Sequence, residues 1–269
     1  RQACVGADCR SAGCSSSAWI LTARNPAGGP GAMPRRFGRS DHRQRLLQVG
    51  QQVVDVLDAH RQPDHVHADP GLGQFEINLM HCDDALRAAD DAWLFKMLVK
   101  GLARRHGFAA SFMAKPYPEY SGNGLHTHFS VIDKEGRNVF SNGGPEGSEM
   151  LMNAIAGCLW AMHDSTLLFA PHSNSYDRLI PEAHAPNAVC WAYENRTSAI
   201  RVPSGSASAR RIEHRTAGGD VNPYLMLAGI LGAALIGIED KMTPPPPITG
   251  NAYALDLPLI PDTWEEAIN

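Results

Sequence analysis

Residues 195–215 read NRTSAIRVPSGSASARRIEHR, and this stretch contains two strand-like pieces, residues 199–202 and 211–214. It also concentrates positive charge in a chain whose formal net charge is −4. Five arginines accompany a single carboxylate, Glu213: they are Arg196, Arg201, Arg210, Arg211 and Arg215. Because a planar guanidinium matches carboxylate or phosphate oxygens two at a time, this excess predicts an anion site. Glu213 is then either a salt-bridge partner or a metal ligand.

The composition is that of a soluble globular protein, with 43% hydrophobic and 19% charged residues in a chain of 269. This length can bury a sizeable core, in one large domain or two small ones. The slight acidic balance argues against nucleic-acid binding. The longest apolar run, residues 225–238, is too short for a comfortable membrane span and predicts a buried core helix. No signal peptide is visible, so we expect a cytoplasmic protein.

Six cysteines are scattered along the chain. The regular spacing of Cys4, Cys9 and Cys14 leaves a metal or disulfide cluster as a minor alternative, because no histidine or CxxC pair completes it. The pattern of Cys82, Cys158 and Cys190 is typical of buried small hydrophobic residues in a reducing compartment.

Two regions differ in character. Residues 1–42 are rich in Gly, Ser, Ala and Arg without hydrophobic periodicity, which predicts an irregular or disordered and possibly non-native segment. Residues 43–269 alternate regular patterns with breaker-rich loops. Expected helices cover residues 46–60, 85–106, 149–164 and the apolar stretch that starts at Asn222 and Pro223. Expected strands cover residues 65–68, 74–79, 109–114, 125–132, 189–193, 199–202 and 211–214.

Helices and strands mix without strict alternation, which favours an α+β fold over a doubly wound α/β fold. In residues 85–106 the helical spacing places apolar side chains on one side of the helix. These side chains are Trp93, Leu94, Met97, Leu98 and Leu102.

Three motifs outside the arginine-rich stretch can carry chemistry. In GQFEINL, alternation places Gln74, Glu76 and Asn78 on one strand face, where the alternative is simply a solvated face. In GLHTHFS, His126 and His128 share a strand face, so both can bind one metal, or one can bind metal while the other contacts phosphate; a structural role is the alternative.

The third motif is NSYDRLIPEAHAP, in which Arg178 lies in a loop-rich stretch that suits a binding residue. The alternative is a surface salt bridge to Asp177 or Glu182. Carboxylates, an imidazole and several arginines together suit phosphoryl transfer from a nucleotide with Mg²⁺ or Mn²⁺. Since neither a Walker loop nor GxGxxG is present, the phosphates would be held by metals and side chains.

Five motifs in order, GQFEI, MAKP…SGNGLHTHFS, NSYDRLIP…AP, NRTSAIRVP and RRIEHR…NPY, closely resemble the catalytic domain of the glutamine synthetase superfamily. The resemblance covers residues 46–269. The residues of these motifs are most similar to those of the branch with gamma-glutamylputrescine (gamma-glutamylpolyamine) synthetases. It implies an antiparallel sheet with flanking helices and an ATP-dependent ligase. In such a ligase, the side-chain carboxylate of glutamate attacks the γ-phosphate of ATP, and the γ-glutamyl phosphate then reacts with an amine or ammonia.

The resemblance also implies roles for individual residues. Catalytic roles fall to Arg196, which matches the phosphoryl-transfer arginine, and to the position of His184. Glutamate-binding positions are Ser121, Gly122, Asn123, Arg178 and Arg215. Nucleotide-binding positions are His128, Ser130, Arg201 and Arg211. Metal-binding positions are Asp69, Glu76, His126 and Glu213. The family further implies a homo-oligomer of stacked rings, with neither nucleic acid nor membrane as partner.

Departures from the family pattern bear on activity. Asp69 stands where the family has a glutamate, and the Glu-x-Glu strand and the small N-terminal β-grasp domain are missing from this sequence. The chain therefore reads as a fragment truncated at both ends, which we expect to be weak or inactive alone. Ammonia-using members have a glutamate at the position of His184. Histidine carries less negative charge, which favours an organic amine as acceptor. An ammonia-using glutamine synthetase and a non-catalytic relative of the fold are the alternatives, with a metal hydrolase a distant fourth.

Overall fold

The computed structural model describes residues 2–4, 22–24, 66–68, 74–181 and 185–269. These residues form a mixed α+β domain, which confirms the predicted fold class. The strands are β1 (Gln2–Cys4), β2 (Thr22–Arg24), β3 (Val66–Ala68), β4 (Phe75–Ile77), β5 (Ala109–Ser111), β6 (Thr127–Ile132), β7 (Trp191–Tyr193), β8 (Ile200–Val202) and β9 (Ile212–His214). The helices are α2 (Ala85–Arg105), α3 (Glu149–Trp160), α4 (Thr166–Phe169), α5 (Ser173–Tyr176), α6 (Pro223–Glu239) and α7 (Trp264–Ile268).

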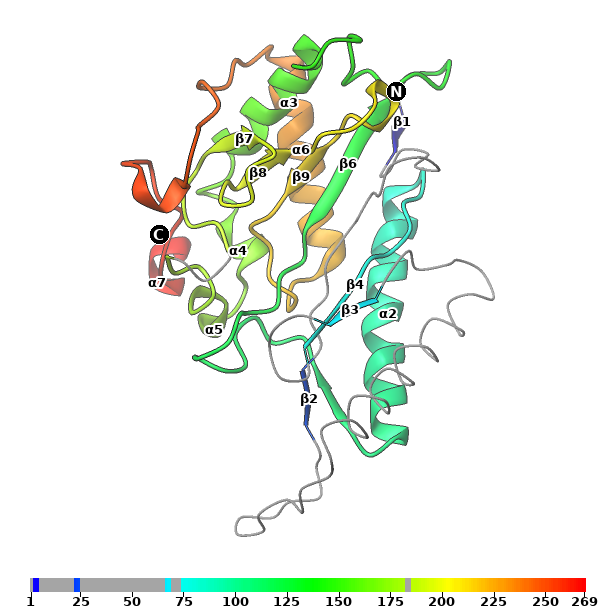
Figure 1. Ribbon diagram of the computed structural model, residues 1–269, viewed down its shortest axis with the longest axis vertical. Coiled ribbons are helices and arrows are strands. Elements are labelled where there is room, and N and C mark those ends of the chain that lie inside the picture. Colours follow the sequence, from blue (N-terminus) through cyan, green and yellow to red (C-terminus); the bar gives the residue numbers. More distant parts are fainter. Residues whose placement is uncertain (1, 5–21, 25–65, 69–73, 182–184) are drawn as a thin grey trace.

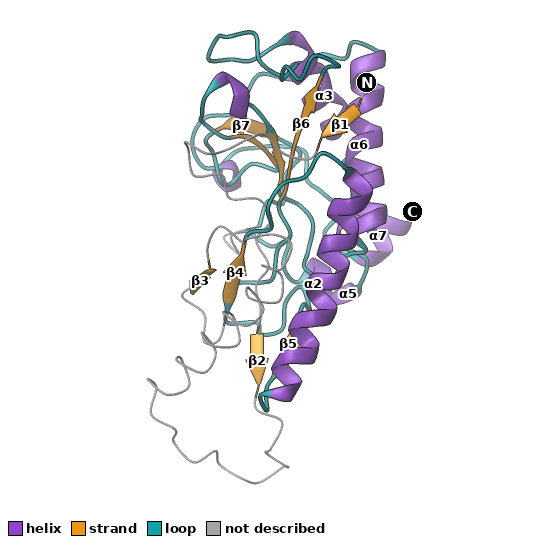
Figure 2. Ribbon diagram, turned by 90° about the vertical axis from the view of Figure 1, so that its right-hand side faces the viewer, coloured by secondary structure: helices purple, strands orange, loops and turns teal. Residues whose placement is uncertain are grey.

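The largest sheet has five strands in the order β1-β6-β9-β8-β7. β9 pairs antiparallel with β6 on one side and with β8 on the other, whereas β7 pairs parallel with β8. Two smaller antiparallel pairs, β2 with β5 and β3 with β4, lie beside this sheet (Figure 1). The long helices α2 and α6 run along one side of the molecule, with the strands on the other (Figure 2).

The core lies between the five-stranded sheet and the paired helices α3 and α6. Phe129 of β6, Ile200 of β8 and Ile212 of β9 are buried there together with residues of both helices. The two helices approach closely because glycines face each other. A Cβ added to Gly157 would lie 2.1 Å from the carbonyl oxygen of Ala233, and one added to Gly237 would lie 2.2 Å from that of Asn153. Only glycine fits such a backbone contact.

Polar caps fix where the helices begin. The Asp84 carboxylate accepts the backbone N–H groups of Leu86 and Arg87 at the start of α2. Asn222 does the same for Tyr224 and Leu225, with Pro223 as the first residue of α6. The predicted start at Asn222 and Pro223 is therefore confirmed, because the caps satisfy N–H groups that have no partner within the helix.

The buried faces of two helices differ from the expectation. On α2 the side chains of Trp93, Leu94 and Met97 are exposed, at 47%, 54% and 58%. The buried face instead carries mostly small residues, which let the helix lie close to its neighbours; it consists of Ala89, Ala92, Phe95, Lys96, Val99 and Ala103.

The apolar run in α6 was predicted to form a buried core helix, and this is wrong for one face. Leu225 is 55% exposed and Leu235 is 53% exposed, while Met226, Leu227 and Ile230 are buried against the core. Among the described residues, no helix combines the length and the apolar character that crossing a membrane requires.

The other expectations have mixed outcomes. Cys82, Cys158 and Cys190 are free and buried, as predicted. Helix α3 ends at Trp160, short of the expected residue 164, and the loop-rich stretch predicted around Arg178 contains the short helix α5. The predicted helix at residues 46–60 lies outside the described residues. Two short strands, β1 and β2, fall within the segment 1–42 that was predicted to be irregular.

Candidate active site on the five-stranded sheet

Three adjacent strands place His128, Glu213 and Arg201 in one row. His128 of β6 is the register partner of Glu213 of β9, and Glu213 is the partner of Arg201 of β8. Residues directly opposite each other in neighbouring strands project from the same face of a sheet. The row therefore joins the HTH motif to the arginine-rich stretch.

Alternation adds the other charged groups to this face. His126 and Ser130 lie two residues on either side of His128, and Arg211 and Arg215 lie two residues on either side of Glu213. The intervening residues face the core, as burial of Phe129, Ile212 and His214 shows. The period of two in a strand thus separates a charged face from an apolar one.

Glu213 is the centre of the charged face. Its side chain is 3% exposed, and its two oxygens accept hydrogen bonds from Arg201 at 2.8 Å and Arg215 at 2.5 Å. Burial alone would raise the pKa of Glu213, but the neighbouring histidines and the guanidiniums of Arg215 and Arg201 hold that pKa well below its usual range. The carboxylate is therefore ionised, and its role as a salt-bridge partner is confirmed.

The two histidines of the HTH motif are neutral near pH 7. Burial lowers the pKa of His128 to about 4, where nearby arginines act in the same direction and Glu213 opposes them. Burial, followed by Arg215, lowers the pKa of His126 well below its usual range. Nδ1 of His128 accepts a hydrogen bond from Nε of Arg211 at 3.1 Å. Nδ1 of His126 lies 3.4 Å from Glu213. A neutral imidazole keeps a lone pair for a metal or a hydrogen-bond donor.

Arg178 joins this face from the loop after α5. It is 3% exposed, and its guanidinium donates to the backbone carbonyls of Thr216 at 2.7 Å and Arg215 at 3.3 Å. The alternative of a surface salt bridge is therefore wrong. Burial lowers the pKa of Arg178 to about 10, so it stays charged at neutral pH.

Glycines bring the SGNG loop against Arg178. A Cβ added to Gly124 would lie 2.9 Å from the Arg178 guanidinium, and one added to Gly122 would lie 2.5 Å from the carbonyl oxygen of Ala114. Gln74 donates to the carbonyls of Ser121 and Gly122 at 3.1 and 3.3 Å. The SGNG loop thus lies against Arg178 through Gly122 and Gly124, and Gln74, the residue before β4, holds the loop in place. The glutamate-binding roles of Ser121, Gly122 and Asn123 stay a prediction.

Several buried polar atoms on this face have unused hydrogen-bonding capacity. Nε of Arg201, Nε of Arg215 and Oγ of Ser130 have no hydrogen-bond partner within the part of the chain that the structure describes. Such buried groups are uncommon in folded proteins, and they are expected where a polar ligand binds.

The remaining predicted site residues are Arg196, Glu76, Asp69 and His184. Arg196 is exposed in the turn between β7 and β8. Glu76 is half-buried on β4, where it is the register partner of His67. Asp69 and His184 lie outside the described residues. Arg210 belongs to the arginine-rich stretch but donates to the carbonyl of Gly144 at 3.2 Å.

Glu194 is a site residue that the sequence analysis missed. Its carboxylate accepts from Arg201 at 3.1 Å and from the backbone N–H of Ser204, so Arg201 lies between Glu194 and Glu213. Its backbone has φ 52°, a left-handed conformation that is uncommon for residues other than glycine. The signal in the sequence is its position directly before Asn195 and Arg196, at the start of the arginine-rich stretch.

Part of a metal site fits this face. His126 and Glu213 supply an imidazole and a carboxylate, which together with further carboxylates suit Mg²⁺ or Mn²⁺. Among the described residues, however, no group of three or more His, Cys, Asp and Glu side chains is positioned to hold a metal ion. Because Asp69 is not described, the four-ligand set of Asp69, Glu76, His126 and Glu213 stays a prediction.

Comparison with known proteins shows the family to which this chain belongs. The family model described as the catalytic domain of glutamine synthetase matches residues 34–269. The gamma-glutamylputrescine synthetase PuuA of Escherichia coli K12 is 42% identical over 184 residues, which are 68% of this chain and 39% of that protein. The glutamine synthetase of Thermococcus kodakarensis is 42% identical over 195 residues, 72% of this chain and 43% of that protein. The chain thus spans about two fifths of the length of these relatives.

A solved structure described as a GmaS/ADP complex has the same fold. It aligns with a TM-score of 0.82 at 30% identity, covering 94% of this chain and 61% of that one.

Proposed function

This chain belongs to the glutamine synthetase family, and from that premise we propose that it is the catalytic domain of an ATP-dependent ligase. The ligase joins the γ-carboxylate of glutamate to an amine through a γ-glutamyl phosphate. The observation that carries the proposal is the convergence of Arg201, Arg211 and Arg215 around Glu213 on one sheet face. Fixed positive groups on a preorganised face suit the charge that develops on a transferred phosphoryl group.

The proposed roles divide this face between two substrates. Arg201, Arg211 and Ser130 hold the nucleotide phosphates together with His128, while Arg178, Arg215 and the SGNG loop hold glutamate. Glu213 lies between the two halves, because it accepts from Arg201 of the nucleotide half at 2.8 Å and from Arg215 of the glutamate half at 2.5 Å. Arg196, exposed in the turn between β7 and β8, is the proposed contact of the transferred phosphoryl group.

Divalent metal chemistry belongs to the proposal. His126 and Glu213, with Glu76 and Asp69, would hold Mg²⁺ or Mn²⁺, which neutralises phosphate charge when bound. The protein groups orient the carboxylate of glutamate toward the γ-phosphate, and the neutral histidines avoid adding positive charge to the metal-binding region.

An organic amine is the proposed acceptor, and ammonia is the second candidate. The amine is supported by His184, which carries less negative charge near neutral pH than the glutamate of ammonia-using members and so suits a compact ammonium ion less well. Ammonia remains a candidate because a gamma-glutamylputrescine synthetase and a glutamine synthetase are both 42% identical to this chain.

The test measures ADP formation by the full-length protein with glutamate, Mg²⁺ and either ammonium, putrescine, ethanolamine or an alkylamine. We expect turnover to require glutamate and an amine, with ammonium a poor acceptor. If ammonium is a better acceptor than every amine, the amine assignment is wrong. Calorimetry of ATP with Mg²⁺ addresses the non-catalytic alternative, because an absence of binding would support it.

Two neighbouring arginines provide a matched pair for the same assay. Arg211→Gln removes a guanidinium from the proposed nucleotide side and should lower kcat/KM on the order of 100-fold. Arg210→Gln is the control, because Arg210 is equally buried but donates to Gly144. Equal losses in the two variants would contradict the proposed role of Arg211.

A further inference from the structure

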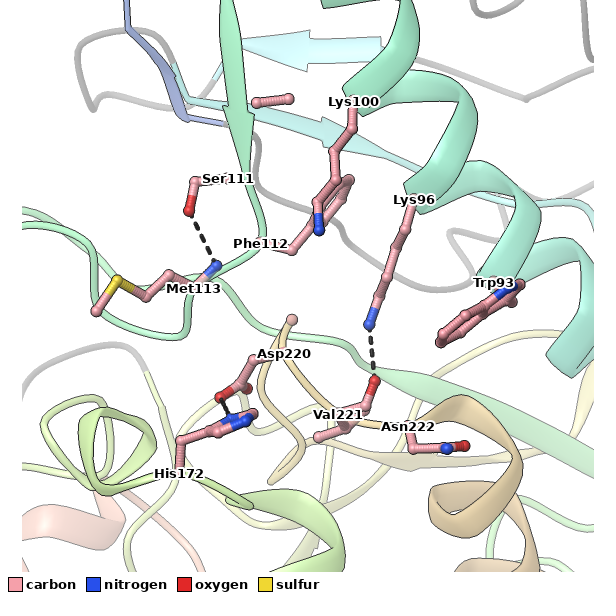
Figure 3. A pocket seen from close by; sticks show the side chains of 12 residues that line it. Trp93, Lys96, Lys100, Ser111, Phe112, Met113, His172, Asp220, Val221 and Asn222 are labelled. Atoms are coloured by element: carbon pink, nitrogen blue, oxygen red, sulfur yellow. Dashed lines mark hydrogen bonds and ion pairs between the residues drawn. The ribbon is translucent and has the colours of Figure 1, made fainter.

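A cavity lies beside the loop that follows Arg215. It has a volume of about 420 Å³ and lies between α2, β5 and the loop that leads into α6 (Figure 3). Its main side chains are Trp93, Lys96, Lys100, Phe112, His172 and Asp220. None of them belongs to the face that carries Glu213. The volume is within the range of small-molecule sites.

Two lysines point into this cavity from one helix. Lys96 and Lys100 are one turn apart on α2, and both side chains extend toward the same space (Figure 3). Lys96 is only 9% exposed, and its ammonium donates to the carbonyl of Val221 at 2.7 Å. The ammonium of Lys100 lies 5.7 Å from the centre of the Phe112 ring. Like charges at this helical spacing repel each other.

The carboxylate of the cavity is engaged through one of its oxygens, while Oδ1 of Asp220 has no hydrogen-bond partner among the described residues. Among the described residues that line the cavity, Asp220 is the only carboxylate. One oxygen of Asp220 lies 2.9 Å from Nδ1 of His172 and accepts the hydroxyl of Ser175 at 2.6 Å. The described lining residues thus carry two lysines against one carboxylate, and this balance favours an anion over a cation.

The remaining walls suit a carbon skeleton. Trp93 and Phe112 provide aromatic surfaces, and Met113 adds a flexible apolar side chain. Aromatic rings pack against planar or apolar groups in small-molecule sites. A bare inorganic anion would leave these walls unused.

We propose that this cavity is a binding site for a small organic carboxylate, held by Lys96 and Lys100 with its apolar body against Trp93 and Phe112. The site is separate from the proposed active site and does not depend on its chemistry. The two are physically adjacent, since the N–H of Gly219, which lines the cavity, donates to the carbonyl of Asn123 in the SGNG loop at 2.8 Å.

The protonation of Lys96 provides a readout. Burial lowers its pKa to about 8, with Asp220 acting in the opposite direction and Lys100 adding to the decrease. A bound carboxylate would favour the charged form of Lys96 and raise that pKa. It would also shield both amines from a reagent.

The experiment uses benzoate as the probe and trace acetylation with acetic anhydride as the measurement. Mass spectrometry follows Lys96 and Lys100 across pH, with the exposed Lys134 as internal reference. Benzoate should slow acetylation at Lys96 and Lys100 several-fold and move the pH midpoint of Lys96 upward. Lys134 should not respond. Benzamide, the uncharged analogue, should have no effect, and phosphate should protect less than benzoate.

Lys100→Gln tests the assignment without removing the buried Lys96. The benzoate concentration that half-protects Lys96 should rise about tenfold when one charged contact is lost. Lys134→Gln is the matched control and should leave this concentration unchanged. The proposal is overturned if benzoate does not slow acetylation, or if phosphate or benzamide slows it equally. It is also overturned if Lys100→Gln leaves the benzoate concentration for half-protection of Lys96 unchanged. Circular dichroism confirms that each variant is folded.

Discussion

The two faces of β9 show how one short strand serves two environments. On one face Glu213 lies among arginines and histidines, and its two oxygens accept hydrogen bonds from Arg201 and Arg215. On the other face Ile212 and His214 are buried against the core. The first face depends on the pairing of charges, and the second depends on the fit of apolar side chains in the core. The comparison indicates that substitutions on the two faces fail for different physical reasons.

The largest expected effect is on the charged face. Glu213→Gln would leave Arg201 and Arg215 buried without their shared carboxylate, and we expect a loss of about 3–5 kcal/mol in the free energy of unfolding. Chemical denaturation at pH 7 measures this. Glu135→Gln is the control, since the Glu135 side chain is 66% exposed, and should have little effect. A neutral Glu213→Gln would mean that the arginines are not held by this carboxylate.

The next effect lies in the helices that support the apolar face. Gly237→Ala would force a Cβ to within 2.2 Å of the Asn153 carbonyl oxygen, which must separate α3 from α6. We expect a destabilisation of about 3 kcal/mol from overpacking.

Gly232→Ala is the matched control on the same helix, because nothing lies within 4 Å of its added Cβ. Alanine there should stabilise the protein by about 0.5–1 kcal/mol through helix propensity. Thermal unfolding of both variants measures the difference in their melting temperatures. Equal melting temperatures for the two would contradict the close contact of the helices.

A pH-dependent effect distinguishes the apolar face further. Burial lowers the pKa of His214 from 6.5 to about 3. Below pH 6.5 the unfolded chain therefore takes up a proton that the folded chain does not, so His214 makes stability fall as pH falls toward 3. The slope is at most about 1.4 kcal/mol per pH unit.

His214→Phe should remove this contribution. Between pH 6.5 and pH 5, the free energy of unfolding of the variant should fall by about 2 kcal/mol less than that of the original protein. Denaturation curves at several pH values measure the slope, and His214→Gln gives the same readout if phenylalanine does not fit beside Phe169. An unchanged slope would show that His214 titrates normally in the folded protein.

The smallest expected effect concerns Glu194 at the rim of the charged face. Its side chain is 48% exposed, so Glu194→Gln should change the free energy of unfolding by less than about 1 kcal/mol. Because Glu194 orients Arg201, the variant should raise the KM for ATP severalfold. If KM is unchanged while stability falls, Glu194 is structural only. Glu146→Gln, on the loop before α3, is a control for charge.

Local sequence signals predicted much of the fold. Periodicity located α2, α3 and α6, and the caps at Asp84, Ser148 and Asn222 start them. The buried sides of α2 and α6 were not predictable in the same way. A helix with apolar residues on more than one side can bury either side, and α2 buries its alanines because small residues allow close packing.

The candidate site was likewise predictable only in part. The spacing of two in RRIEHR and in HTH already places Arg211, Glu213 and Arg215 on one face and His126 with His128 on another. The sequence does not say that these faces meet. That depends on the register of β6 against β9, which sets His128 opposite Glu213. Glu194 entered the site only through the pairing of β7 with β8, which brings it next to Arg201.

The sequence by itself determined the family, the fold class and the alternation that separates charged from apolar side chains on each strand. These properties are local, because they follow from residue types and from the period of two in a strand. Only the tertiary structure decided which charges meet, that Arg178 is buried against the backbone of Thr216, and that two lysines of α2 share a cavity with Asp220. Contacts between segments far apart in the chain depend on register and packing, which no short stretch of sequence specifies.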